Sequence, residues 1–76
     1  MDQGSQPLKF LKFADVVKRT SISRAELYRR VEAGTFPRPV PLGGARVGFV
    51  EAEVDRWMVD RLATRDAKLT GGAAHA

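Results

Sequence analysis

Three prolines at alternate positions constrain the fold of this 76-residue chain more than any other feature. Pro37, Pro39 and Pro41 lack the backbone N–H that a helix or a central strand requires, so we expect them in an extended edge segment. Gly43-Gly44 follows as a turn signal, and the run Arg46–Val50 has the composition of a returning strand. The prolines therefore predict a β-hairpin in the middle of the chain.

The segment before the prolines carries a complete signal for the start and end of a helix. Ser23 fits the N-cap, and Glu26 stands three residues later, as in a capping box. Ile22 and Leu27 have the spacing of a hydrophobic staple. Gly34 fits the C-terminal stop. These signals predict a helix that begins after Ser23 and ends before Gly34.

Three further elements are predicted by the apolar pattern. Leu8–Phe13 mixes apolar residues with lysines and is expected to form a short edge strand leading into a helix over Phe13–Arg19. Thr20–Ile22 is a short break before the capped helix. A last helix is expected over Glu51–Arg65, because apolar residues recur along one of its sides. These apolar residues are Val50, Val54, Trp57, Met58 and Leu62. The predicted fold class is mainly α with a small β-hairpin.

The domain organisation follows from the same pattern. Residues 8–69 are expected to form one folded domain, since a chain of this length accommodates only one. Residues 1–7 are polar and are expected to form a flexible N-terminus. Residues 70–76 are small and glycine-rich and are expected to form a flexible C-terminal tail.

Composition argues against several classes of function. The chain has no cysteine and a single histidine, His75, so neither a thiolate or histidine metal site nor histidine-dependent catalysis is expected. No apolar run approaches the roughly 20 residues of a membrane span, so no membrane association is expected. We therefore predict a binding module without enzymatic activity, cofactor or metal.

Positive charge gathers in the middle of the chain. Residues 23–50 carry five arginines against two glutamates, a net +3 of the +4 for the whole sequence. Two short helices joined by a tight turn, the second one basic and capped, describe a helix-turn-helix. In this unit the second helix lies in the DNA major groove with its N-terminal part near the base edges. Double-stranded DNA is therefore the expected partner.

Helical geometry sorts the residues of the capped helix. Leu27 and Val31 define its buried side, and the opposite half is free to meet DNA. The predicted DNA-reading residues are Ser23, Arg24, Ala25, Tyr28 and Arg29. Tyr28 either contacts DNA or packs against the domain. Two residues are candidates for the DNA backbone: Lys12, and Arg30, which otherwise forms a surface salt bridge.

The hairpin is the second candidate contact with DNA. Arg38 and Arg46 flank the predicted tip, Gly43 and Gly44, as basic residues do in the wing of a winged helix-turn-helix. The arginines or the backbone of the tip can reach the adjacent minor groove or its phosphates.

The segment Leu11–Asp66, about three quarters of the chain, resembles the AlpA family of phage and prophage regulators. The matching segments are Ser21–Arg24, Tyr28-Arg29, Glu32–Val40, Leu42–Phe49 and Glu53–Trp57. The resemblance implies a winged, MerR-like helix-turn-helix related to excisionases. It further implies a sequence-specific transcriptional regulator encoded on a mobile element. Together with the composition, which favours a cytoplasmic binding module, this leads us to expect a protein of the bacterial cytoplasm that is associated with the nucleoid. Family members often have a polar residue at the position of Ala25, which can offer DNA only a methyl contact.

Two questions stay open at this point. A module of this size contacts few base pairs, so a homodimer or a head-to-tail array on DNA is expected. An array would favour an excisionase, which bends DNA and directs an integrase, and a dimer would favour promoter regulation. The alternative outside DNA recognition is a protein-interaction module that docks on an integrase or a polymerase subunit.

Overall fold

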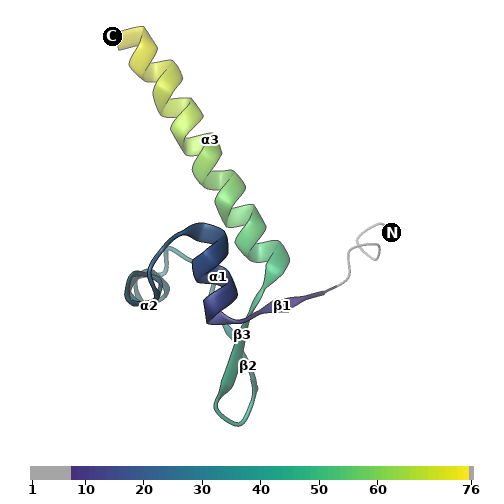
Figure 1. Cartoon of the computed structure of the whole chain (residues 1–76). Helices are drawn as coiled ribbons and strands as arrows, with labels where there is room; N and C mark the ends of the chain where they lie inside the picture. Colours follow the sequence, from purple (N-terminus) through teal and green to yellow (C-terminus); the bar gives the residue numbers. More distant parts are fainter. Residues whose placement is uncertain (1–7, 76) are drawn as a thin grey trace.

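The computed structural model describes the backbone of residues 8–75 and the side chains of residues 8–68, so the predicted N-terminal segment 1–7 lies outside the described residues. A short strand precedes two helices, a hairpin follows them, and a long helix completes the described chain (Figure 1). The elements are β1 Phe10–Leu11, α1 Phe13–Thr20, α2 Arg24–Ala33, β2 Val40–Gly43, β3 Arg46–Val50 and α3 Glu51–His75. This mainly helical arrangement with a small sheet confirms the predicted fold class and is that of a winged helix-turn-helix.

Local caps define the ends of the first two helices. The backbone N–H of Lys12 donates to Asp15 Oδ2 at 3.2 Å where α1 begins. α1 ends at Ser21, which adopts the left-handed conformation (φ 62°) and donates its N–H to the Val17 carbonyl at 2.8 Å. The N–H of Glu26 donates to Ser23 Oγ at 3.2 Å, as the N-cap prediction requires. Gly34 ends α2 with a positive φ of 80°, which glycine adopts without a steric penalty.

The sheet is antiparallel with strand order β1-β3-β2. β2 and β3 form the predicted hairpin, but its turn lies at Gly44-Ala45, one residue later than predicted, because Gly43 still pairs with Arg46. β1 adds to the other edge of β3, with Phe10 opposite Val50. The prediction of a short edge strand is therefore confirmed, and the structure supplies its partner.

The core lies between the sheet and the three helices. Its fully or nearly fully buried residues are Leu11, Phe13, Val16, Leu27, Phe36, Phe49 and Val54. Ile22, Val31, Trp57 and Met58 are partly buried and pack against this cluster. The indole Nε1 of Trp57 also donates a hydrogen bond to the Thr35 carbonyl at 2.8 Å. α3 is thereby joined to the segment that follows α2.

α3 begins against the domain and then extends away from it, in the direction opposite to the hairpin (Figure 1). Arg19, in the last turn of α1, holds the start of α3 against α1. Its guanidinium donates to Glu51 at 3.0 Å and to Asp55 at 2.8 Å, and the bond to Glu51 is the largest cause of the raised pKa of Arg19. Leu62, predicted on the apolar packing side, is 50% exposed and does not belong to the core cluster.

The length of α3 differs from the prediction. The helix continues to His75 rather than ending near Arg65, so the predicted domain boundary after residue 69 falls within it. Alanine, leucine and lysine in this stretch have high helix propensity, whereas each of the two glycines costs about 1 kcal/mol relative to alanine. The flexibility expected of residues 70–76 is a separate property and stays a prediction. Within residues 8–75, no helix is both long and apolar enough to cross a membrane.

Candidate DNA interface

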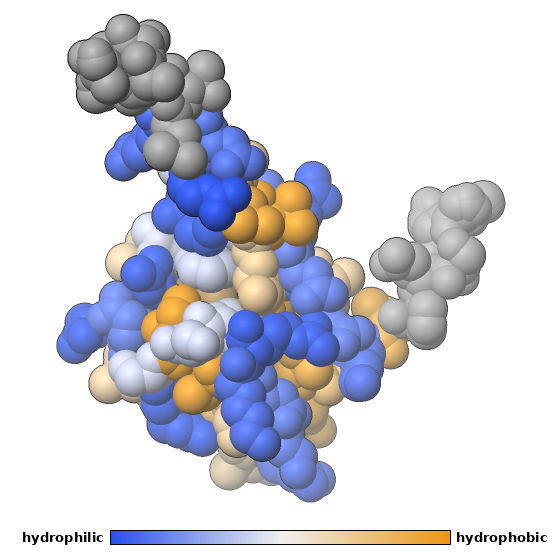
Figure 2. Space-filling model, turned by 45° about the horizontal axis from the view of Figure 1, so that its top comes forward, coloured by the Kyte–Doolittle hydropathy of each residue, from blue (hydrophilic) through white to orange (hydrophobic). Residues whose placement is uncertain are grey.

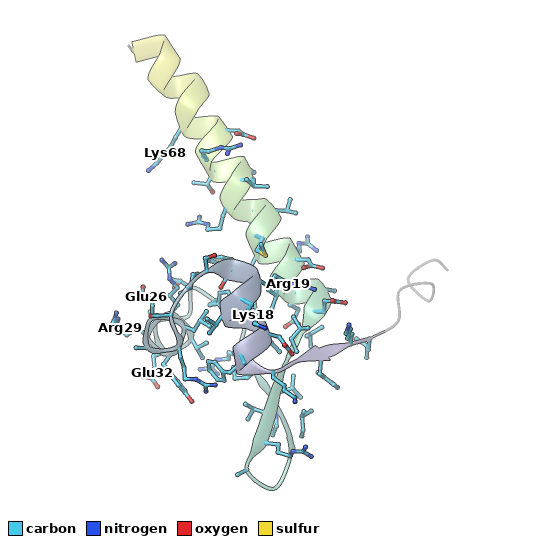
Figure 3. All side chains as sticks on the ribbon, viewed as in Figure 1. Lys18, Arg19, Glu26, Arg29, Glu32 and Lys68 are labelled. Atoms are coloured by element: carbon cyan, nitrogen blue, oxygen red, sulfur yellow. The ribbon has the colours of Figure 1, made fainter. Side chains whose placement is uncertain are left out.

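The outer side of α2 carries most of the predicted DNA-reading residues. Leu27 is fully buried against the core, and Ser23, Arg24, Ala25, Tyr28 and Arg29 are all exposed, as the helical geometry predicts. The side chain of Arg29 is 72% exposed and lies on the side of α2 that faces away from α3 (Figure 3). α2 therefore presents two arginines and a tyrosine to solvent from a helix whose other side is anchored.

Two of these exposed side chains meet on one residue of α1. The ring of Tyr28 stacks on the ring of Phe13, with centroids 4.7 Å apart and an interplanar angle of 29°. The guanidinium carbon of Arg24 lies 4.6 Å from the same Phe13 centroid. The sequence left open whether Tyr28 is free or packed; its ring packs on Phe13, yet the residue keeps 53% of its surface exposed.

Glu26 gathers the other two arginines of α2. Arg29 donates to Glu26 Oε1 through Nε at 3.1 Å and also through Nη2. Arg30 Nε lies 3.2 Å from Glu26 Oε2, and its guanidinium lies 5.8 Å from the Trp57 ring centroid. The sequence left two roles open for Arg30, a contact with the DNA backbone or a surface salt bridge. In the structure Arg30 forms the salt bridge, with Glu26. The Glu26 side chain thus bonds to arginines rather than to the Ser23 N–H, so only the Ser23 half of the predicted capping box forms.

The arginine contacts change the titration of Glu26. The hydrogen bond from Arg29, helped by the charge of Arg30, outweighs the opposing effect of desolvation and lowers the pKa of Glu26 below its ordinary value. A lowered pKa stabilises the folded state above the ordinary glutamate pKa, and this stabilisation is lost as the pH falls through the lowered pKa.

We therefore expect the Glu26 carboxylate to titrate at lower pH in the protein than in an unfolded peptide, as followed by NMR of the side-chain carboxyl. Replacing Arg29 with alanine is expected to move the midpoint upward, because the main cause of the shift is removed. Arg65→Ala is the matched control, since this arginine pairs with Asp66 on α3. A Glu26 midpoint that rises equally in both variants would contradict the assignment.

The hairpin presents its basic residues separately from α2. Arg38 precedes β2, Arg46 begins β3, and both are exposed together with Gly43 and Gly44. The tip of the hairpin projects from the domain, in the direction opposite to α3 (Figure 1). The backbone at its tip follows left-handed geometry, with φ 104° at Gly43 and 61° at Gly44, which favours glycine. Lys12 is exposed just before α1.

Sequence reasoning missed two residues that organise this surface. Phe13 was predicted only as the first residue of a helix, and Glu26 only as half of a capping box. For Glu26, the available signal was its spacing to Arg29 and Arg30, which follow it by three and four residues along the helix. No comparable signal existed for Phe13, because its partners belong to another helix.

Among residues 8–68, no group of three or more histidine, aspartate or glutamate side chains is placed to hold a metal ion. Figure 2 shows mostly hydrophilic side chains over the face that it presents, with hydrophobic patches between them. The exposed side of α2 and the hairpin carry most of the residues predicted to contact DNA and form the candidate functional surface.

These features together define a class of protein. Two helices joined by a three-residue turn, a hairpin arm and a capped helix with exposed arginines make a winged helix-turn-helix. The chain belongs to the family described as prophage CP4-57 regulatory protein (AlpA), whose sequence model matches residues 9–62. It is accordingly a phage-associated regulator.

Two relatives are similar over most of this chain. The uncharacterized protein ORF88 of Enterobacteria phage P4 is 37% identical over 57 residues, which cover 75% of this chain and 65% of the phage protein. The DNA-binding transcriptional activator AlpA of Escherichia coli K12 is 34% identical over 61 residues, which cover 71% of this chain and 86% of that protein. No solved structure matches the chain.

Proposed function

We propose that this protein is a sequence-specific regulator that binds double-stranded DNA through α2 and the hairpin. The observation that carries the proposal is the exposed side of α2, where Arg24, Tyr28 and Arg29 face solvent while Leu27 anchors the helix in the core. An α-helix fits the major groove, which is about 12 Å wide, and arginine can bind guanine through two hydrogen bonds. The similarity to the DNA-binding transcriptional activator AlpA of Escherichia coli supports the same function.

The hairpin supplies the second part of the proposed interface. Arg38 and Arg46 carry positive charge on an arm that leaves the domain, and glycines at its tip allow close approach of the backbone to phosphates. Lys12 and Arg30 are proposed to contact the DNA backbone. Arg30 would have to exchange its ion pair with Glu26 for a phosphate oxygen.

We further propose that more than one copy acts on each DNA site, as a homodimer or as a head-to-tail array. One module with a single reading helix contacts too few base pairs to distinguish a target from competing genomic sequence. An array would suit an excisionase that directs an integrase, and a dimer on an inverted repeat would suit a promoter regulator. α3 is one surface for such contacts, because Val59 and Leu62 are exposed on it.

Selection of bound sequences from a random duplex pool at physiological salt tests the proposal. We expect one short motif to be enriched in repeated copies, and the relative orientation of the copies distinguishes dimer from array. Binding without enrichment that disappears as salt rises would reflect phosphate attraction alone and would contradict sequence-specific recognition. That outcome would instead favour a protein-interaction module.

A further inference from the structure

Phe13 connects the reading side of α2 to the core of the domain. It is the first residue of α1, only 8% exposed, and its ring meets the ring of Phe49 edge to face at 5.0 Å. The same ring carries the stacked Tyr28 at 4.7 Å and the Arg24 guanidinium at 4.6 Å. A buried aromatic ring, held by β3, is thus in contact with two exposed side chains of α2.

Such a contact limits the conformations that the two exposed side chains sample before any ligand arrives. A free arginine loses rotamer freedom when it binds, and holding it in advance removes part of that cost. The contact of the Arg24 guanidinium with the Phe13 ring is a cation–π contact, which uses none of the N–H groups of the guanidinium. Those N–H groups are the ones that form paired hydrogen bonds with guanine.

We propose that Phe13 is a positioning residue for DNA recognition, which orients Arg24 and Tyr28 toward the base edges without contacting DNA itself. This inference rests on the proposed function. It assigns part of the sequence specificity to a buried side chain of α1, in addition to the exposed residues of α2. Arg29, which is held by Glu26 instead, does not depend on this ring.

The test compares Phe13→Leu with Val54→Ala. Leucine keeps an apolar side chain in the core but has no ring on which Arg24 and Tyr28 can stack. Val54 is a buried residue of α3 in the same core cluster, so its truncation reproduces a loss of stability without removing the ring of Phe13. For each variant, affinity is measured for the selected duplex and for a scrambled duplex, below the melting temperature of the least stable variant.

We expect Phe13→Leu to reduce the ratio of the two affinities by about tenfold, because two long side chains are no longer held in place. Affinity for the scrambled duplex is expected to stay unchanged, since no charge is lost. Val54→Ala is expected to keep the wild-type ratio, and Phe13→Tyr, which retains the ring, is expected to keep most of it. Phe13→Met, also without a ring, replaces the leucine variant if that variant does not fold.

A double-mutant cycle decides whether Phe13 acts through Arg24. In an Arg24→Ala background, Phe13→Leu is expected to have lost much of its effect on the affinity ratio. An equal effect in both backgrounds, or an equal loss in Val54→Ala, would overturn the positioning role and leave the proposed function intact. A wild-type protein that does not distinguish the two duplexes would instead overturn the proposed function, and the positioning role with it.

Discussion

Replacing Phe49 with alanine is expected to lower the free energy of unfolding by about 3–5 kcal/mol, the usual cost of truncating a buried phenylalanine. Phe49 is fully buried in β3, the central strand, and its ring contacts Phe13 at 5.0 Å and Phe36 at 5.8 Å between centroids. The truncation would therefore leave a cavity where the sheet and α1 meet. Domains of this size have only about 5–10 kcal/mol in total, so much of the stability would be lost.

Urea denaturation followed by the fluorescence of Trp57, the single tryptophan of the chain, measures this change. Val47→Ala is the matched control, because Val47 lies in the same strand but is 40% exposed. We expect a change below about 1 kcal/mol for the control, as for most partly exposed positions. A Phe49→Ala midpoint equal to that of the control would show that the core is centred elsewhere.

Replacing both Arg24 and Arg29 with alanine is expected to lower affinity for the selected duplex by well over tenfold. Each bidentate arginine–guanine contact contributes about 1–3 kcal/mol of discrimination, so the loss of two exceeds one power of ten. The melting temperature is expected to change little, because both residues are exposed and neither fills the core. Fluorescence anisotropy with a labelled duplex and a thermal melt measure the two quantities.

Arg56→Ala with Lys68→Ala provides the control for net charge. Both residues are exposed on α3, and Figure 3 shows Lys68 on the projecting part of that helix, away from α2. This variant loses the same two positive charges, so its affinity is expected to fall through weaker long-range attraction alone. Equal losses in both double variants would assign the binding to net charge and would remove α2 from its proposed role.

Local signals were sufficient for α2 and the hairpin. Ser23 and Gly34 predicted the ends of α2 to the residue, because a cap acts on backbone groups only a few positions away. The alternate prolines predicted an extended edge segment because proline fixes φ and lacks the backbone N–H. The glycine pair predicted the turn because glycine adopts the positive φ that a tight turn requires. The exposed and buried sides of α2 followed from helical periodicity alone.

Contacts between distant segments were not predictable in the same way. The pairing of β1 with β3 joins Phe10 to Val50 across forty positions of sequence, and the sequence suggested only that β1 was an edge strand. Arg19 was predicted only as the last residue of a helix, whereas in the structure it pairs with Glu51 and Asp55 on α3. The residues proposed to contact DNA stay predictions that only the binding experiments test.

The sequence by itself determined the order of the elements, the ends of α2 and the concentration of arginines on α2 and the hairpin, because these follow from backbone chemistry and spacing within a few residues. Only the tertiary structure decided which side chains organise the reading side of α2. Phe13 comes into contact with Arg24 and Tyr28 because the turn at Ser21 folds α1 against α2. Such a contact depends on the relative position of two helices, which neither helix encodes in its own sequence.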